Sequence, residues 1–190
     1  MRSREEVTDV IKAYDVRGIV GESITPELIT DVGAAFGRLM RKEEAHTIAI
    51  GHDMRPSSPE LARAFADGVL SQGMDVLFLG LTSTDQLYFV SGDRDIPGAM
   101  FTASHNPAPD NGYKVYLGGT VAQGDGRGVQ IVPPFDAEIA AAIEAAPPAD
   151  QVPMNDDLVE AVDPRDEYVA EAIKLASGEE AARADLRIVL

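Results

Sequence analysis

The residues best suited to chemistry lie together in one short segment. Ser104, His105 and Asn106 come directly after an apolar run, Gly98 to Thr102, that predicts a buried strand. A serine hydroxyl on such a loop could act as a hydrolytic nucleophile or could carry a phosphoryl group. A serine hydrolase is the weaker interpretation, because adjacent side chains rarely point at each other and no Gly-x-Ser-x-Gly sequence surrounds Ser104. We therefore ask whether the rest of the sequence provides the residues that phosphoryl transfer needs.

Phosphoryl transfer also needs cations, because a phosphate monoester dianion repels an incoming alcohol. A guanidinium can make forked contacts with phosphate oxygens, so Arg17 and Arg55 are candidates. Arg17 lies three positions after Tyr14, a second candidate ligand, in a segment that predicts a glycine-bounded turn. An ion pair with Asp15 is the alternative for Arg17. Arg55 follows a predicted strand end, where it could contact an anion or form a salt bridge with Asp53.

Three further side chains are candidates for the same site. Lys114 lies ten positions after Ser104 on a predicted strand and could neutralise phosphate charge or move the proton of an attacking hydroxyl. The alternative is a surface lysine on an exposed strand face. His105 could donate a hydrogen bond to the phosphate or could only order the loop. Asn106 is a further candidate ligand of the phosphate or substrate.

The elements that would position these residues alternate between the periods of helices and strands. Each predicted strand is short and apolar, and the first two predicted helices begin with capping residues, Thr25 in one and the pair Ser57 and Glu60 in the other. The predicted helices start near residues 25, 57 and 84, and the predicted strands cover residues 47–51, 75–79 and 98–102. This alternation predicts an α/β fold with a mixed, mainly parallel sheet between helices. Ligands of such sheets lie beyond the carboxyl ends of the strands, where Ser104 falls.

The remaining sequence predicts additions to this sheet. Asp110-Asn111-Gly112 is typical of a turn and residues 113–117 of a strand, so we expect an appended β-hairpin. A helix is predicted over residues 135–146, which completes a first domain of residues 8–146. The proline-rich segment 147–157 predicts a linker. Residues 158–190, with a helix from about Asp163 to Ala176 and a strand over residues 186–190, predict the incomplete start of a second α/β domain.

The composition excludes several functional classes. A formal net charge of −16 disfavours a nucleic-acid partner, because most of the surface would repel a polyanion. No stretch is apolar for the roughly 18 residues that a membrane span needs, and the N-terminus lacks the apolar core of a secretory signal. The chain has no cysteine, so it has no disulfides. We expect a cytoplasmic protein that binds a small molecule and neither nucleic acid nor a membrane.

Four ordered segments together resemble the N-terminal, phosphoserine-bearing domain of the α-D-phosphohexomutases, the phosphomannomutases and phosphoglucomutases. The segments are residues 12–18 (KAYDVRG), 51–55 (GHDMR), 102–107 (TASHNP) and 111–116 (NGYKVY). The resemblance implies that phospho-Ser104 exchanges its phosphate with a hexose through a bisphosphorylated intermediate, which interconverts hexose 1-phosphate and hexose 6-phosphate. It also implies site roles for Arg17 and Lys114. The sugar, mannose or glucose, is left open, because different segments resemble different branches of the family.

The resemblance also implies Mg²⁺ as a cofactor, bound in the family by the phosphoserine and by aspartates of a second domain. In this chain only Ser104, through its phosphate, is expected to bind the metal. Gly124-Asp125-Gly126-Arg127 contains a single carboxylate and is interpreted as a glycine turn. Because Mg²⁺ requires several oxygen ligands, we expect negligible mutase turnover from this chain by itself. The alternative function is a non-catalytic folding or interaction module that keeps the mutase fold.

Overall fold

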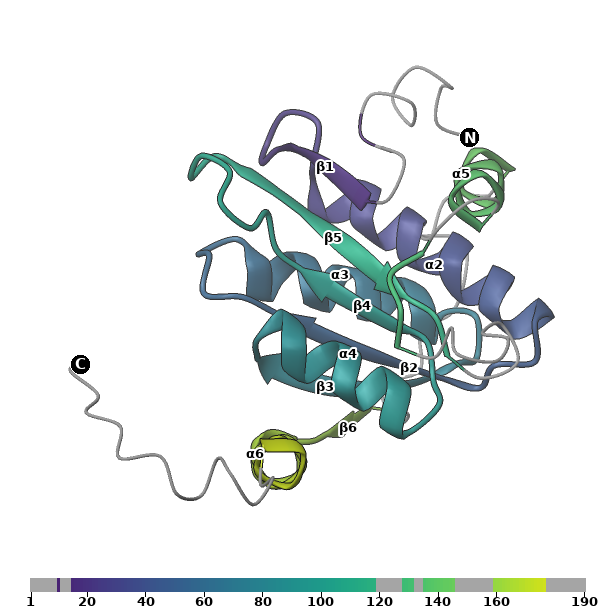
Figure 1. Ribbon diagram of the computed structural model, residues 1–190. Helices are drawn as coiled ribbons and strands as arrows, with labels where there is room; N and C mark the ends of the chain where they lie inside the picture. Colours follow the sequence, from purple (N-terminus) through teal and green to yellow (C-terminus); the bar gives the residue numbers. More distant parts are fainter. Residues whose placement is uncertain (1–9, 11–14, 119–127, 132–134, 146–158, 177–190) are drawn as a thin grey trace.

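The structure is a computed structural model that describes residues 10, 15–118, 128–131, 135–145 and 159–176 (Figure 1). The described residues form a six-stranded sheet with the strand order β1-β5-β4-β2-β3-β6. The strands are β1 (Asp15–Ile19), β2 (Thr47–His52), β3 (Asp75–Leu81), β4 (Gly98–Phe101), β5 (Asp110–Tyr116) and β6 (Val159–Ala161). The helices are α2 (Pro26–Lys42), α3 (Ser58–Leu70), α4 (Thr84–Asp93), α5 (Phe135–Ala145) and α6 (Arg165–Ala176).

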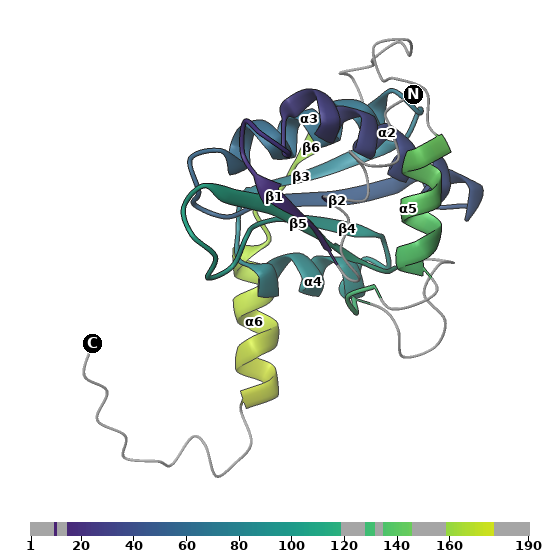
Figure 2. The ribbon, with the colours of Figure 1, turned by 90° about the horizontal axis from the view of Figure 1, so that it is seen from above.

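The predicted mixed, mainly parallel sheet is confirmed. β2 pairs in parallel with β3 and β4, and β3 pairs in parallel with β6. β5 is antiparallel to both of its neighbours, β1 and β4. Figure 2 shows α2 and α3 on one face of the sheet and α4 on the other. The carboxyl ends of β2, β3 and β4 therefore lie at one edge of the sheet, between the two helical layers.

The local signals at the start of α2 act as predicted. The Thr25 hydroxyl accepts a hydrogen bond of 3.2 Å from the backbone N–H of Leu28, and Pro26 is the first helical residue. The buried face of α2 packs closely on α3. A Cβ atom on Gly68 of α3 would collide with the carbonyl oxygen of Thr30, so only glycine allows this separation between the two helices.

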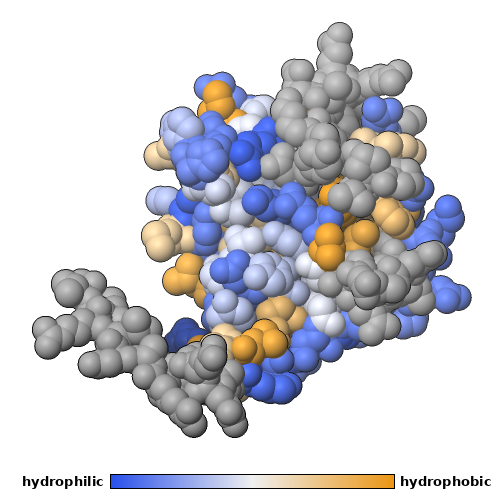
Figure 3. Space-filling model, viewed as in Figure 1, coloured by the Kyte–Doolittle hydropathy of each residue, from blue (hydrophilic) through white to orange (hydrophobic). Residues whose placement is uncertain are grey.

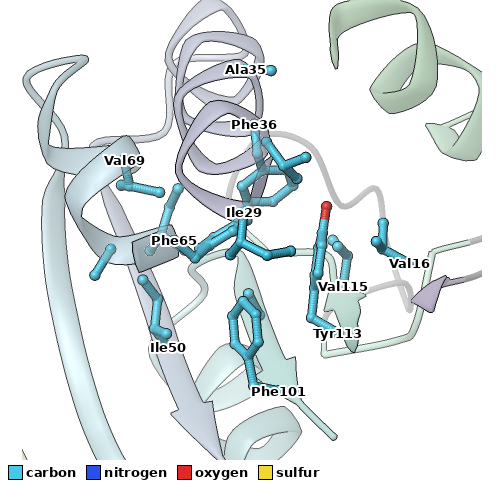
Figure 4. Close-up of a cluster of buried hydrophobic side chains, with 14 of the residues drawn as sticks. Val16, Ile29, Ala35, Phe36, Ile50, Phe65, Val69, Phe101, Tyr113 and Val115 are labelled. Atoms are coloured by element: carbon cyan, nitrogen blue, oxygen red, sulfur yellow. The ribbon is translucent and has the colours of Figure 1, made fainter. Parts of the chain in front are cut away.

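An aromatic cluster fills the space between this helix pair and the sheet (Figure 4). Phe65 of α3 lies with its ring centroid 5.0 Å from that of Tyr113 and 5.5 Å from that of Phe101. Phe36 of α2 lies 5.6 Å from Phe65. The cluster joins α2 and α3 to β4 and β5, the two strands that flank Ser104. On the face seen in Figure 3 the surface is mostly hydrophilic, with small separate apolar patches.

The hairpin prediction is right in outline and wrong in detail. Asp110, Asn111 and Gly112 form the first part of β5, where Gly112 pairs with Arg17 of β1 and Asn111 with Gly18. The turn that joins β4 to β5 is instead the segment 102–109, which we call the Ser104 loop. Because β1 pairs with β5, Arg17 lies in a strand and not in the predicted turn. Pairing of β1 with β5 forms the sheet edge, and neither segment signals this pairing by itself.

Ser57 is also placed differently from the prediction. It precedes α3, but its side chain makes no capping hydrogen bond to that helix. Its backbone is already helical, with φ −84° and ψ −16°, so its hydroxyl is not directed at the free N–H groups of the first turn. The Ser57 hydroxyl accepts a hydrogen bond of 2.8 Å from the side-chain amide of Asn111 in β5.

The sheet extends beyond the predicted first domain. β6, which the sequence pattern does not predict, lies beside β3, with Val159 paired to Val76. The predicted helix that ends at Ala176 corresponds to α6. The predicted linker, residues 147–157, and the predicted strand, residues 186–190, lie outside the described residues. A second domain stays a prediction, and β6 places residues 159–161 with the first sheet.

Tyr113 gives a first testable prediction. Its side chain is fully buried, and its hydroxyl has no hydrogen-bond partner among the described residues. Burial raises the pKa of Tyr113 far above its ordinary value. Above pH about 10 a tyrosine ionises in the unfolded chain but not in this site, so each further pH unit should lower the free energy of unfolding by about 1.4 kcal/mol.

We therefore expect Tyr113→Phe to reduce the loss of stability above pH 10, as measured by urea unfolding between pH 8 and pH 11. At neutral pH the variant should be as stable as the parent, because no hydrogen bond to a described residue is removed. Part of the alkaline loss should persist, since burial and the charge of Asp85 raise the pKa of Tyr116 to about 12. An unchanged slope above pH 10 would show that Tyr113 does not contribute.

Candidate active site

Ser104 lies exposed on the Ser104 loop, just beyond the carboxyl end of β4. Its backbone N–H donates to the Thr102 hydroxyl at 2.9 Å, and the Asn106 N–H donates to the Ala103 carbonyl at 3.0 Å. The turn closed by these bonds holds Ser104 at φ 53°, in the left-handed region that disfavours residues with a Cβ atom. Non-glycine residues in this conformation are uncommon and concentrate at functional sites. The loop therefore presents the hydroxyl at a cost in stability.

This cost gives a second prediction. Ser104→Gly is expected to raise the free energy of unfolding by about 1 kcal/mol, because glycine adopts a positive φ without steric penalty. Ala103→Gly is the matched control. Ala103 is buried and its φ is not in the left-handed region, so this change should lower the free energy of unfolding. Urea unfolding of both variants makes the comparison, and destabilisation by Ser104→Gly would contradict the assigned strain.

Asn106 connects the loop to Arg17. An Arg17 Nη1–H donates to the Asn106 side-chain oxygen at 3.0 Å, and the Asn106 side-chain NH₂ donates to Asp110 at 2.9 Å. Both ends of the amide are engaged, which fixes its orientation. The structure thus brings Arg17 and Asn106 together beside Ser104. Asn106 is better placed to hold Arg17 against the loop than to bind a phosphate with its own side chain.

Lys114 shares a face of the sheet with Arg17. In the β1–β5 register Arg17 pairs with Gly112, so Lys114, two residues further along β5, is its diagonal neighbour on the same face. Tyr113, which alternates with Lys114, points into the aromatic cluster on the opposite face. The Lys114 side chain is half-buried. Contact between Lys114 and a phosphate on Ser104 stays a prediction.

His105 lies beside the Ser104 hydroxyl without a good hydrogen bond to it. The distance from Ser104 Oγ to His105 Nδ1 is 3.5 Å, the outer limit for such a bond. A serine nucleophile and its base are expected at about 2.6–3.2 Å, so this geometry disfavours the hydrolase interpretation. Both side chains are exposed, which leaves His105 accessible to a ligand of Ser104.

The Arg55 side chain bonds to backbone carbonyl oxygens of the Ser104 loop and of Asp110, which follows it. Its Nη1 donates to the carbonyl oxygens of Pro107 and Asp110, at 2.9 and 3.0 Å. Its Nη2 donates to those of Ser104 and Asn106, at 3.0 and 2.8 Å. These four bonds use the hydrogens of both terminal nitrogens. The predicted role of Arg55 as a direct phosphate ligand therefore does not fit the arrangement.

The predicted partner of Arg55, Asp53, belongs to a polar network beneath the loop. Asp53 Oδ2 lies 3.6 Å from Arg55 Nε, and Asp53 Oδ1 accepts from the Ser58 hydroxyl at 2.6 Å. Asn111, which is fully buried, donates to the hydroxyls of Ser57 and Ser58 at 2.8 and 2.9 Å. Sequence analysis missed this network. The available signal was an asparagine inside an alternating strand, since asparagine is uncommon in strands without a specific partner.

One predicted site residue and the predicted glycine turn fall outside the part of the chain that the structure describes. Tyr14 and the segment Gly124–Arg127 lie outside the described residues. Among the residues that the structure describes, no group of three or more His, Cys, Asp or Glu side chains could hold a metal ion. In that same part of the chain, no helix is long and apolar enough to cross a bilayer.

The arrangement of strands and loop agrees with a comparison to known families. Residues 8–149 match the family described as "Phosphoglucomutase/phosphomannomutase, alpha/beta/alpha domain I". The chain belongs to this family. The resemblance noted in the sequence to the phosphohexomutases is thus confirmed, and the four segments that carry it fall within the matched residues.

Two curated relatives illustrate how far the family likeness extends. A phosphoglucomutase of Neisseria meningitidis serogroup B is 39% identical over 118 residues, which are 62% of this chain and 26% of that protein. A phosphomannomutase of Vibrio cholerae is 34% identical over 112 residues, 57% of this chain and 24% of the relative. This chain therefore spans about a quarter of the length of the curated relatives that it matches.

A solved structure supports the same assignment. The phosphoglucomutase/phosphomannomutase family protein of Burkholderia thailandensis matches with a TM-score of 0.73 and 27% identity. The match covers 92% of this chain and 36% of that one. The mixed sheet with helices on both faces is therefore the arrangement found in this family.

Proposed function

We propose that this chain is the phosphoserine-bearing domain of a phosphohexomutase and that Ser104 carries the phosphoryl group. The observation that carries the proposal is the Ser104 loop itself. It exposes one hydroxyl, in a strained left-handed conformation, at the carboxyl edge of the sheet. Arg17 donates a hydrogen bond directly to that loop, at the side-chain oxygen of Asn106. A fixed donor beside a cation is what phosphoryl transfer requires.

In the proposed reaction, phospho-Ser104 donates its phosphoryl group to a hydroxyl of a hexose monophosphate. The bond from the serine oxygen to phosphorus breaks as the bond from the sugar oxygen forms, which gives a hexose bisphosphate. The serine oxygen leaves as an alkoxide and needs a proton, while the attacking hydroxyl loses one. Lys114 is the proposed carrier of this proton, and Arg17 the proposed cation near the phosphate oxygens. Return of the other phosphate to Ser104 completes the interconversion of hexose 1-phosphate and hexose 6-phosphate.

Mg²⁺ is the cofactor that the family resemblance implies. Bound at the phosphoserine it would neutralise phosphate charge, with the phosphate of Ser104 as one ligand. Asp53 and Asp110, two carboxylates next to the loop or its Arg55 support, are already engaged with Arg55 and Asn106. The described residues therefore do not complete a magnesium site, and no step of the mechanism is assigned to the ion. For the same reason we expect the chain alone to show negligible steady-state turnover of glucose 1-phosphate, with each half-reaction slow and followed as a single turnover.

Glucose and mannose phosphates are the proposed substrates, because the relatives carry the names phosphoglucomutase and phosphomannomutase. We further propose a cytoplasmic protein without nucleic-acid or membrane partners. The charge of −16 supports the absence of a nucleic-acid partner, because most of the surface would repel a polyanion.

Intact-mass analysis tests the proposal. The chain is incubated with a hexose 1,6-bisphosphate and Mg²⁺, and we expect one added phosphoryl group that Ser104→Ala abolishes. If the chain is instead a non-catalytic module, neither protein should gain mass. An acyl-fluorophosphonate probe provides the control for hydrolase chemistry, and we expect it to leave Ser104 unlabelled.

A further inference from the structure

We propose that Arg55 is a positioning residue, which gathers the carbonyl groups of the Ser104 loop onto one side and thereby turns two N–H groups of the loop toward the phosphate. This role differs from substrate binding, because Arg55 acts through the loop backbone. The consequence for transfer rate depends on the proposed function of Ser104. The consequence for the loop's structure does not.

The contacts of Arg55 reach three residues of the loop and the first residue of β5. Its four hydrogen bonds, of 2.8 to 3.0 Å, reach carbonyls from Ser104 at one end to Asp110 at the other. Arg55 is about 50 positions earlier in the chain, so the loop is held from outside rather than by its own sequence. Only a planar guanidinium offers paired hydrogens in this geometry, whereas a lysine ammonium offers three hydrogens at a single point.

The peptide geometry converts this contact into an orientation for the N–H groups. In a planar trans peptide, the C=O of one residue and the N–H of the next point in opposite directions. Because the carbonyls of Ser104 and Pro107 point at Arg55, the N–H groups of His105 and Ala108 point away from it. Neither of these N–H groups donates to a described residue. They remain available to an anion.

The orientation has an electrostatic consequence for the phosphate. Carbonyl oxygens carry partial negative charge and would repel a phosphate dianion if the loop turned over. N–H groups held in advance toward the phosphate would stabilise it without reorganisation during transfer. Arg55 is therefore expected to affect the rate of transfer and not the affinity for the sugar.

The groups that support Arg55 are mostly desolvated. The Arg55 side chain is 14% exposed and Asp53 is 21% exposed, so the charged hydrogen bonds between them and the loop are weakly screened. Asp53 also accepts from the Arg55 backbone N–H at 2.9 Å and from Ser58 at the start of α3. The guanidinium is thus fixed to the helix and sheet on one side and to the loop on the other.

The test compares Arg55→Lys with Arg63→Lys, a matched control on α3 that pairs with Asp67 on the helix surface. Two quantities are measured well below the thermal midpoint of each protein. Amide hydrogen exchange by NMR reports loop order at Asn106 and Asp110. The phosphorylation rate of Ser104 is measured against the concentration of hexose 1,6-bisphosphate, which separates the maximal rate from the half-saturating concentration.

For Arg55→Lys we expect loop exchange to rise by about tenfold or more and the maximal rate to fall by about tenfold or more, with the half-saturating concentration unchanged. Arg63→Lys should change none of these. A raised half-saturating concentration with unchanged loop exchange would overturn the proposal and identify a substrate contact. Unchanged values throughout would overturn it as well.

A second variant and a second measurement decide the proposal if the first variant or the reaction fails. If Arg55→Lys does not fold, Asp53→Asn weakens the same support more gently and should show the same pattern at smaller size. If the parent chain accepts no phosphate, the proposed function fails. The exchange measurement then still decides the structural claim, which unchanged loop exchange in Arg55→Lys would overturn.

Discussion

Lys114→Met is expected to slow phosphorylation of Ser104 by about 10²- to 10³-fold, the range typical of losing a positioned proton carrier or charge stabiliser. Methionine keeps the length of the side chain and removes its charge and its protons. Since Lys114 is half-buried and no described residue bonds its ammonium, the fold should tolerate the change. The measurement is the maximal rate of Ser104 phosphorylation, with the thermal midpoint as a check on folding.

Two companion variants show whether the charge or the proton of Lys114 matters and whether loss of any lysine has the same effect. Lys114→Arg keeps the charge but cannot release a proton near neutral pH, so partial recovery of rate would assign Lys114 an electrostatic role alone. Lys174→Met, at an exposed lysine of α6, should leave the rate unchanged. A normal rate in Lys114→Met would remove Lys114 from the mechanism.

Asn111→Asp should produce the largest loss of stability, a decrease of about 3 kcal/mol or more in the free energy of unfolding. The change preserves the size of the side chain but replaces two donors with an acceptor that faces the hydroxyls of Ser57 and Ser58. It also buries a negative charge, in a site with no solvent exposure, near Asp53. Urea unfolding at pH 7 gives the magnitude.

The pH dependence of this loss follows from burial of the introduced carboxylate. Burial raises the pKa of a carboxyl group, so the penalty is present at neutral pH and shrinks as pH falls toward about 4. Gln72→Glu is the matched control, because the same exchange of amide for acid occurs beside Arg38 on the surface. It should change stability little. A similar loss in both variants would show that the buried network does not matter.

Local sequence signals were sufficient for most elements of the fold. Thr25 and Pro26 define the start of α2, and the apolar run before Ser104 defines β4, because caps and periodicity act within one turn or strand. The placement of Ser104 beyond a strand end followed from the same pattern. The family resemblance added the expectation that Arg17 and Lys114 lie near it, and the strand register places these two on one face.

The features that sequence patterns did not predict depend on distant partners. Asp110-Asn111-Gly112 has the composition of a turn, but Asn111 bonds to serines more than 50 positions away and Gly112 pairs with β1, so the segment is a strand. Arg55 was predicted to contact an anion or Asp53. Its four bonds to the Ser104 loop require the loop's folded shape, which no local spacing encodes.

The side chains around Ser104 fall into two groups. Arg55 and Asn111 hold the loop and its strand in place from below. Arg17 and His105 lie beside the loop, and Lys114 is proposed to reach a phosphate on Ser104. The charged groups that touch the backbone are thus separated from those proposed to act on the ligand.

The most direct measurement of the central claim is return of the phosphate. The chain is phosphorylated on Ser104, freed of sugar, and mixed with a hexose monophosphate in the presence of Mg²⁺, with intact mass and ³¹P NMR followed together. We predict that the protein loses its phosphoryl group while an equal amount of hexose bisphosphate forms. Phosphate that stays on the protein, or that leaves only as inorganic phosphate, would contradict the account.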